Sequence, residues 1–445
     1  MSRWRSADGR RSFLHDAAIL VGNQFVVMGI GVLGGVVLAR LLGAAGRGVI
    51  AAATVYPAIV LSFCEMGVRQ SAAYHLGKQV YTNEQVTVAI SALVLVVGLA
   101  GALICAALLA WMDNPAITPL IVALAVLPIP FSIFTSYSSG IFLGNRRVGQ
   151  FATVSWLAAV LNLAALGGFV WLFDWGVAGA LLATWISGLV VAGYAAVKTI
   201  ELASLRPRFE WPVVRDLLVK GAVYAVALFV ITLNYKVSIV VMERLSTVAE
   251  IGVFALGVSV AQLTWALPQA ITTALFSHSA TAPDEDVFSG KVQRLFRVNL
   301  LLALVLVLGL GLVAPVLLPL VYGEEFRPSI RVLWYLLPGV FCLLGLKILN
   351  MDLAGRGRPN ASLWAMVPAL ALNGVLAILW VPRHGALGAA AASSVGYACG
   401  GLGMAAVYCR YVGIGFPTLW RYRRSDFDFI RQRWPGFLKF RGSTP

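Results

Sequence analysis

Four positively charged side chains stand out because they lie inside, or at the end of, long apolar segments of the chain. Lys236 and Lys347 lie within such segments, and Arg40 and Arg244 each end one. An ionisable group at membrane depth costs about 2.5–3.5 kcal/mol on insertion scales, so each calls for a ligand or a partner. Cations in these places favour an anionic ligand, and we take all four as candidate substrate-binding residues.

Each of these cations also has a structural alternative. Lys236 could make an ion pair or polar contact within a helical bundle. Lys347 is near enough to one end of its segment to extend its ammonium group to the interface, or to pair with Asp352. Arg40 and Arg244 could simply anchor helix ends at the membrane surface. These alternatives stay open at the level of sequence.

Four amide side chains, and one acidic residue with a basic residue close to it in sequence, also lie in the apolar segments. The amides could bind hydroxyl groups of a ligand, or could hydrogen-bond between helices. They are Asn23, Gln24, Asn234 and Gln262. Glu65 and Arg69 are four residues apart, which places them on one face of a helix and predicts a structural ion pair.

Motifs for metal, nucleotide or redox chemistry are missing from the sequence. It contains no G-x-x-x-x-G-K-[ST] loop and no H-E-x-x-H pair. The four histidines lie at or beyond the ends of apolar segments, and the five cysteines have neither metal-ligand nor disulfide-framework spacing. We therefore expect no metal and no cofactor.

The elements that must position the polar residues are helices in a membrane. Hydrophobic residues make up 60% of the chain and charged residues only 12%, against about 25% charged in soluble domains. Apolar segments of about 20 or more residues recur throughout, and each can cross a bilayer as a helix. We predict an all-α integral membrane protein with about twelve transmembrane helices, at 17–42, 47–68, 86–111, 117–142, 150–173, 176–197, 217–243, 250–276, 297–322, 330–354, 361–381 and 385–409.

The two halves of the chain are similar in sequence. RLLGAAGRGVIA at 40–51 matches RLSTVAEIGVFA at 244–255, and GVAGALLAT at 176–184 matches GALGAAAAS at 385–393. An even number of helices separates the matching points, so both halves have the same orientation and are related by an axis along the membrane normal. This predicts two parallel six-helix lobes, a 6+6 repeat, around a central cavity.

Charge distribution sets the orientation and the outer limits of the lobes. The net charge is +15, and most of the 34 Lys and Arg residues fall on one side of the predicted helices. The positive-inside rule places that side and both termini in the cytoplasm, so the charge does not indicate nucleic acid. The predicted divisions are a basic N-terminus at 1–16, an N-lobe at 17–197, a cytoplasmic linker at 198–216, a C-lobe at 217–409 and a basic tail at 410–445.

Residues near the ends of the first two helices resemble a known family. LARLLGAAGRGVIAAATVYPAIV at 38–60 and EMGVRQSAAYHLGK at 65–78 are similar to oligosaccharide flippases and polysaccharide transporters of the multidrug/oligosaccharidyl-lipid/polysaccharide (MOP) superfamily. There, LAR-x-LG-x-x-x-G follows helix 1, and an acidic residue with apolar-Gly-apolar ends helix 2. The departure is Glu65, where the family usually has Asp.

The resemblance implies a V-shaped pair of lobes and a transport function. Its substrate would be a polyprenyl-pyrophosphate-linked oligosaccharide, moved from the cytoplasmic to the outer leaflet for surface polysaccharide biosynthesis, by alternating access. A cationic cavity is what a pyrophosphate headgroup would need. The implied location is the bacterial plasma (inner) membrane. The implied partners are the lipid-linked glycan, the bilayer, and glycosyltransferases or a polymerase of the same pathway.

Other functions compete with this interpretation. A cation-coupled multidrug exporter of the same superfamily would favour carboxylates or aromatics in its site, whereas this chain offers two lysines and few deeply placed acids. A membrane glycan polymerase would be an enzyme and would need a sizeable extramembrane loop. A lipid II flippase shares the expected architecture but usually has two further helices. We expect a transporter and not an enzyme.

Overall fold

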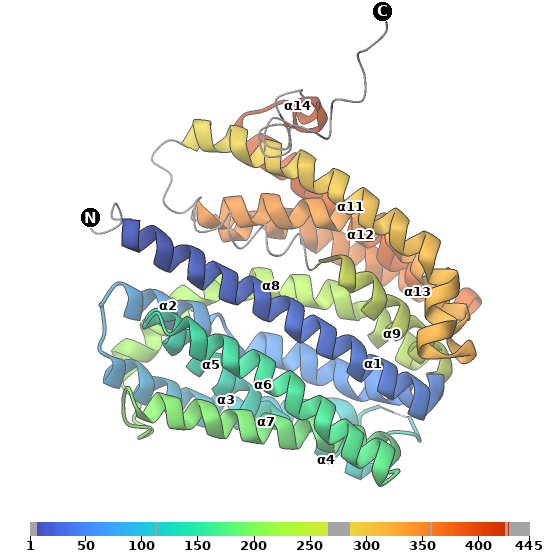
Figure 1. Cartoon of the computed structure of the whole chain (residues 1–445), viewed down its shortest axis with the longest axis horizontal. Coiled ribbons are helices and arrows are strands. Elements are labelled where there is room, and N and C mark those ends of the chain that lie inside the picture. Colours follow the sequence, from blue (N-terminus) through green and yellow to red (C-terminus); the bar gives the residue numbers. More distant parts are fainter. Residues whose placement is uncertain (1–6, 113, 266–284, 357, 423–425, 427–445) are drawn as a thin grey trace, which may run out of the picture.

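The structure, a computed structural model, describes the whole chain except residues 1–6, 113, 266–284, 357, 423–425 and 427–445. The described residues are overwhelmingly helical (Figure 1). In chain order the helices are α1 (Ala7–Cys64), α2 (Val68–Gly77), α3 (Asn83–Ala110), α4 (Pro119–Val126), α5 (Pro128–Gly144), α6 (Val148–Leu166), η2 (Gly167–Leu172), α7 (Gly176–Ile200), α8 (Trp211–Leu245), α9 (Val248–Gln262), η3 (Leu263–Trp265), α11 (Glu285–Tyr322), η4 (Glu324–Phe326), α12 (Pro328–Gly355), η5 (Pro359–Ser362), α13 (Leu363–Val412) and α14 (Phe416–Trp420).

Ten helical stretches among the described residues are long and apolar enough to cross a membrane. Two of them are double, because α1 bends at Gly43 and α13 bends at Gly385. These glycines have φ values of 64° and 52°, in the left-handed region that glycine adopts without steric cost. Each bend lets one continuous helical segment cross twice. The prediction of an all-α membrane protein with about twelve spans is confirmed.

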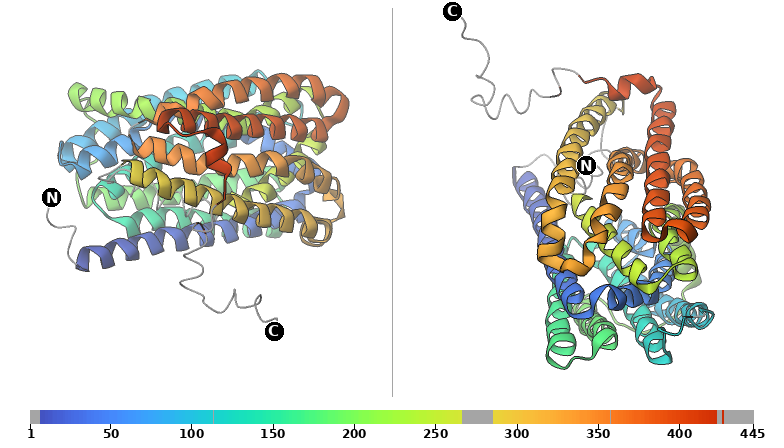
Figure 2. Two further views of the ribbon diagram at one scale, coloured as in Figure 1. Left: turned by 90° about the horizontal axis from the view of Figure 1, so that it is seen from above. Right: turned by 90° about the vertical axis from the view of Figure 1, so that its right-hand side faces the viewer.

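The spans form two lobes that follow the order of the chain. Helices α1 to α7 occupy the lower part of Figure 1, and α11 to α13 occupy the upper part. The view along the helices in Figure 2 (right) shows the same division. The lobes meet where α1 packs against α8 and α9, and where α2 packs against α8. The predicted pair of six-helix lobes is therefore observed.

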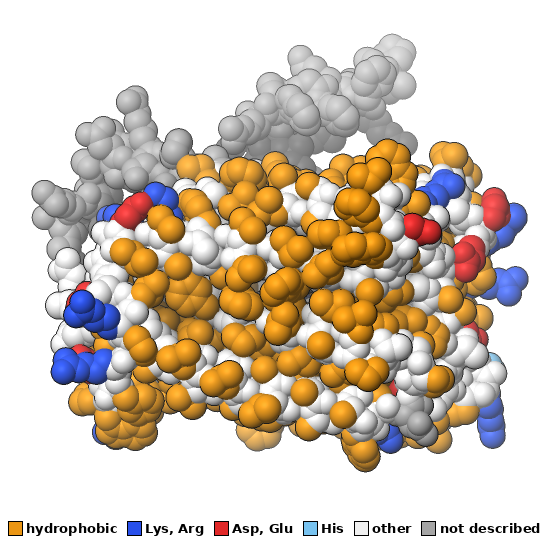
Figure 3. Space-filling model, turned by 90° about the horizontal axis from the view of Figure 1, so that it is seen from below, with side chains coloured by type: hydrophobic (Ala, Val, Ile, Leu, Met, Phe, Trp, Pro, Cys, Tyr) orange, Lys and Arg blue, Asp and Glu red, His pale blue; other side chains and the backbone are white. Residues whose placement is uncertain are grey.

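We name the two ends of the bundle after glycines at which chain segments turn. The Gly43 end carries the bends at Gly43 and Gly385, and the Gly67 end carries the turn at Gly67. Between the ends, the surface is a broad apolar belt, and charged side chains gather at its two margins (Figure 3). Some belt side chains are largely exposed, such as Leu312 at 80% and Leu103 at 71%. Such a belt matches the hydrocarbon layer of a bilayer.

The two predicted polar extensions of the chain are only partly described. Helix α1 begins at Ala7, within the predicted N-terminus at 1–16, and residues 1–6 lie outside the described part. Helix α13 continues to Val412, and α14 follows it. Within the predicted tail at 410–445, residues 423–425 and 427–445 lie outside the described part. The start of this tail is held to α11 by a buried ion pair, in which the Arg297 guanidinium contacts both oxygens of Asp426 at 2.7 and 2.8 Å.

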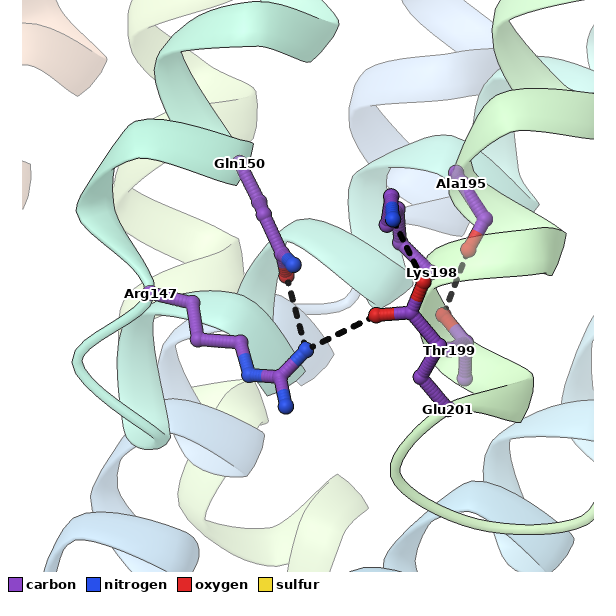
Figure 4. Close-up of polar contacts among 6 residues, drawn as sticks. All are labelled: Arg147, Gln150, Ala195, Lys198, Thr199 and Glu201. Carbon is purple, nitrogen blue, oxygen red and sulfur yellow. Dashed lines mark hydrogen bonds and ion pairs between the residues drawn. The ribbon is translucent and has the colours of Figure 1, made fainter.

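The start of α6 and the end of α7 are tied together by charge (Figure 4). Arg147 Nη1 donates to Glu201 Oε2 at 3.3 Å and to Gln150 Oε1 at 3.5 Å, and Lys198 Nζ also contacts the Glu201 carboxylate. The pKa of Glu201 lies below its ordinary value, because its neighbours favour the charged form of the carboxylate. Lys198 makes the larger contribution and Arg147 the smaller. The site is exposed to solvent, so this contribution to stability is small.

Replacing Glu201 with glutamine is expected to lower thermal stability slightly at neutral pH and by less in acid. A carboxyl group with a depressed pKa contributes stability above its unfolded-state pKa, and this is lost as pH falls through the folded value. Thermal unfolding in detergent at pH 7 and at about pH 3 measures the difference. An equal gap between wild type and variant at both pH values would contradict the charge assignment.

Candidate substrate cavity

A cavity of about 510 Å³ lies between the two lobes. Helix α1 forms one wall, and α9, η3, α11 and α12 form the other. The apolar and small residues of α1 that line it are Val27, Met28, Gly31, Val32 and Gly35. The polar groups that line the cavity are Gln24, Arg47, Ser259, Gln262, Tyr322 and Lys347.

Three of the residues singled out in the sequence converge on this cavity. Gln24 comes from α1 in the first lobe, whereas Gln262 and Lys347 come from α9 and α12 in the second. They are far apart in sequence, and the packing of α1 against α9 brings their helices together. The cavity therefore combines amide groups and a cation from opposite walls.

Lys347 is held against an aromatic ring at the cavity wall. Its Nζ lies 3.8 Å from the centroid of the Trp265 ring, which is a cation–π contact. Asp352, the alternative partner allowed by the sequence, accepts hydrogen bonds from Arg356 Nε and Tyr408 Oη, each at 3.0 Å. Lys347 thus presents positive charge where the cavity and the aromatic wall meet.

A second cation, Arg47, lines the cavity and was not among the predicted site residues. Its Nη1 donates to the Gly35 carbonyl oxygen at 3.0 Å, and its Nη2 donates to Ser259 Oγ at 3.2 Å. The sequence places Arg47 at the first residue of the predicted helix at 47–68, on the outer side of the membrane. The signal that could have found it is Gly43, because a bend there starts the next helix early and turns Arg47 back toward the bundle.

Arg40 and Arg244 lie outside the described lining of this cavity and join the lobes at the Gly43 end. Arg40 Nε donates to the Val321 carbonyl oxygen at 3.0 Å, and its Nη2 contacts the Leu320 carbonyl oxygen. These carbonyls belong to the last turn of α11, where no intrahelical donor remains. The Arg244 guanidinium lies 4.4 Å from the Trp111 ring centroid, beyond the end of α3. Each of the two repeat-equivalent arginines therefore contacts the opposite lobe.

The second lobe makes a reciprocal contact with the bend of α1. The backbone N–H of Ala44 donates to Glu325 Oε1 at 2.9 Å. Ala44 follows the non-helical Gly43, so its N–H is one of the donors that the start of a helix leaves unpaired. Glu325 thus caps a helix of the first lobe, while Arg40 caps a helix of the second.

Two repeat-equivalent glycines lie in close contact with the opposite lobe at this end. A Cβ atom on Gly48 would lie 1.8 Å from the Val248 carbonyl oxygen, and one on Gly252 would lie 1.9 Å from the Ala44 carbonyl oxygen. Both clashes are with backbone, which cannot give way as a flexible side chain can. The Gly43 end is thus closed by backbone packed on backbone.

The lobes also touch at the Gly67 end, along α8. A Cβ atom on Gly67 would lie 2.2 Å from the Gly221 carbonyl oxygen. Further along α8, Ser62 Oγ donates to Thr232 Oγ1 at 3.0 Å. The lobes therefore contact each other at both ends of the bundle.

The family assignment comes from comparison with known sequences. The profile of the family described as "Polysaccharide biosynthesis protein" matches residues 13–276, which is more than half of the chain. The chain belongs to this family. Comparison with curated protein sequences gives no match.

Solved structures of similar fold include a lipid flippase and multidrug transporters. The lipid II flippase MurJ, in an inward closed conformation, is similar with a TM-score of 0.75 and 14% identity, over 94% of this chain and 96% of that chain. An inward-facing multidrug resistance MATE transporter of the MOP superfamily has a TM-score of 0.61 and 16% identity, over 91% and 95%. A mutant of the Vibrio cholerae MATE transporter VcmN has a TM-score of 0.59 and 17% identity, over 91% and 97%. The chain therefore has the fold of these membrane transporters, in agreement with the fold that the sequence resemblance implied.

Three further predicted site residues of this polysaccharide biosynthesis protein lie outside the described cavity lining. Lys236, on α8, is half-buried and makes no hydrogen bond or ion pair with the residues that the structure describes. Asn23, on α1, is half-buried beside Gln24. Asn234 is fully buried, and its Oδ1 accepts a hydrogen bond from Asn373 Nδ2 at 2.9 Å. In this conformation Asn234 therefore joins α8 to α13.

The predicted ion pair between Glu65 and Arg69 is corrected by the structure. Helix α1 ends at Cys64, and Met66 and Gly67 have φ values of 43° and 62°. This turn removes the helical geometry that would have brought the two side chains together, and no ion pair joins them in the described structure. The Glu65 carboxylate instead accepts a hydrogen bond from Ser136 Oγ at 2.7 Å.

Within the part of the chain that the structure describes, no group of three or more His, Cys, Asp or Glu side chains could hold a metal ion. The chemistry offered by the cavity is therefore that of cations, amides, hydroxyls and an aromatic face. Such groups bind and orient a ligand.

Proposed function

We propose that the protein is a flippase that moves a polyprenyl-pyrophosphate-linked oligosaccharide from the cytoplasmic to the outer leaflet, for surface polysaccharide biosynthesis, by alternating access. The observation that carries this proposal is the pair of cations, Arg47 and Lys347, in a cavity between the lobes of a MOP-type transporter. A pyrophosphate group supplies the complementary charge.

The two cations suit different parts of a pyrophosphate. The planar guanidinium of Arg47 can bind a phosphate through two parallel N–H groups, whereas the Lys347 ammonium acts as a compact point charge. The cavity volume of about 510 Å³ lies within the usual range of about 300–1,000 Å³ for ligand sites. Gln24 and Gln262 would hydrogen-bond sugar hydroxyls on either side of the headgroup.

The remaining candidates act in other steps of the proposed cycle. Lys236 lies on α8, a helix at the lobe interface, and would face the headgroup after the lobes have moved. Arg40 and Arg244 would draw the pyrophosphate outward once their contacts at the Gly43 end break. Asn23 and Asn234 are the remaining proposed substrate-binding residues. Their alternative role is hydrogen bonding between helices.

The proposed orientation follows the charge of the chain. The Gly67 end and both termini would face the cytoplasm of a bacterium, and the Gly43 end would face outward across the plasma membrane. The lobes at 17–197 and 217–409, the linker at 198–216 and the polar ends at 1–16 and 410–445 follow from this orientation. Glycosyltransferases or a polymerase of the same pathway would supply or consume the lipid-linked glycan.

Export of drugs is the second candidate, because MATE transporters share the fold. A site for cationic drugs would favour carboxylates. The described lining of this cavity contains two cations and no carboxylate, which favours an anionic substrate.

Headgroup translocation by the purified protein in proteoliposomes tests the function. We expect flipping of a fluorescent oligosaccharide on polyprenyl pyrophosphate, and little flipping of the same oligosaccharide on an uncharged polyprenol. Transport of a cationic dye with no movement of the pyrophosphate lipid would support the drug exporter instead.

A further inference from the structure

A second hollow, of about 760 Å³, opens at the Gly43 end of the second lobe. It shares no lining residue with the substrate cavity described above. Two side chains of its floor, Val253 and Val332, are almost fully buried. Its polar side chains include three basic ones, Arg327, Arg331 and His384. We call this hollow the basic pocket.

Local structure fixes the walls of the basic pocket. Ser329 Oγ donates to the Val253 carbonyl oxygen at 2.9 Å, which holds the start of α12 against α9. Gly385 allows the sharp bend of α13, and this bend sets His384 and Ala386 beside the pocket. The basic side chains therefore extend from segments whose backbones are held in place.

The basic pocket has an excess of positive charge. Arg331 is exposed and makes no hydrogen bond or ion pair with the described residues. Arg327 contacts only Glu324 among them, at 3.4 Å, and both side chains are about three-quarters exposed, so that pair is weak. The pocket has one acidic lining residue, Glu250, which accepts a hydrogen bond from the Ser246 hydroxyl, against three basic ones. An incoming anion would meet two available guanidinium groups.

One wall of the basic pocket is apolar and continues the surface that faces lipid. Trp334 and Pro315 line it, and the Trp334 indole N–H donates to the Gly311 carbonyl oxygen at 2.9 Å. Leu312 and Val316, beside Pro315 on α11, are 80% and 69% exposed. Tryptophan and arginine side chains are common where the hydrocarbon of a membrane meets water, and Trp334 lies in the same pocket as Arg327 and Arg331. A ligand with an anionic head and apolar tails matches both parts.

We propose that the basic pocket binds the phosphate group of an anionic phospholipid from the leaflet at the Gly43 end. An adjoining hollow of about 410 Å³ shares Arg327 and Pro315 with it and is also lined by Arg40. Arg327 directly follows η4, which carries Glu325, the residue that caps Ala44 of the other lobe. A bound phosphate would therefore steady the segment that closes the Gly43 end. The proposal rests on this pocket alone and is independent of the transported substrate.

Lipid titration of the full-length protein in an uncharged detergent tests the proposal. We expect phosphatidylglycerol to bind at least about tenfold more tightly than phosphatidylcholine, because two guanidinium groups favour net negative charge. The double variant Arg327→Gln/Arg331→Gln should lose this preference. Arg383→Gln, which removes a charge at the same end outside the pocket lining, should keep it.

Any one of four results would overturn the proposal. The first is equal binding of the two lipids by the wild type. The second is an unchanged preference for phosphatidylglycerol in the double variant, and the third is a loss of this preference in Arg383→Gln as large as in the double variant. Displacement of phosphatidylglycerol by millimolar inorganic phosphate would also overturn it, in favour of a site for free anions. Thermal unfolding without lipid checks the fold of the double variant, and Arg331→Gln alone serves as the test if that variant is unstable.

Discussion

Substituting Gly48 by valine is expected to reduce headgroup translocation at least about tenfold while leaving membrane insertion intact. A Cβ atom at this position would lie 1.8 Å from the Val248 carbonyl oxygen of the other lobe. Overpacking typically costs about 1–3 kcal/mol, and each 1.4 kcal/mol shifts an equilibrium tenfold. Because the clash exists only while the lobes touch, the substitution opposes closure of the Gly43 end more than it opposes folding of either lobe.

The matched control for this experiment is Gly29→Val, on the same helix. A Cβ atom on Gly29 would meet nothing within 4 Å, so transport should stay near the wild-type rate. Labelling of a cysteine at Ser259, in a cysteine-free background, reports on closure, because Ser259 lines the cavity. Gly48→Val should raise labelling by an impermeant thiol reagent from the Gly43 side. Normal transport in Gly48→Val would show that closure of this contact is not part of the cycle.

Replacing Lys347 with glutamine is expected to lower the rate of pyrophosphate-lipid flipping by about 10- to 100-fold. Hydrogen bonds to charged groups contribute about 1.5–3 kcal/mol, and the variant leaves a polar group of similar length without the charge. The cation–π contact with Trp265, at 3.8 Å, would be lost as well. Initial rates in proteoliposomes, at matched protein content, measure the effect.

Two variants separate the role of charge at Lys347 from a general loss of stability. Lys347→Arg keeps the cation and should recover much of the activity. Lys198→Gln removes a lysine that pairs with Glu201 on the surface, far from the described cavity lining, and should flip the lipid normally. If Lys347→Gln and Lys198→Gln behaved alike, Lys347 would not be a headgroup contact.

The fold was predictable from sequence because lipid leaves the backbone few choices. Without water to satisfy them, backbone groups in a bilayer must bond within a helix or a closed barrel, so apolar segments of this length become helices. The repeat between 40–51 and 244–255 also gave the shared orientation of the lobes. It even aligned Gly48 with Gly252, although only the structure shows that the two pack across the lobe interface.

The candidate site was predictable only in part, because it depends on how the lobes are placed. Lys347, Gln24 and Gln262 were found as polar groups in apolar segments. Arg47 was not predicted as a cavity residue, because its position depends on the bend at Gly43. A sequence pattern does not show that a side chain after such a bend points toward the cavity. For Asn234, burial inside a lobe and exposure to the cavity give the same sequence signal.

Photo-crosslinking tests most directly whether the cavity between the lobes holds the headgroup. The probe would be a polyprenyl-pyrophosphate sugar with a diazirine on the sugar, flipped by the wild-type protein and then irradiated. Crosslinks in the peptides that contain Gln262, Trp265 and Lys347 are expected, and unlabelled pyrophosphate lipid should compete for them. Crosslinks confined to the exposed belt, for example around Leu312, with none in the cavity wall would contradict the central claim.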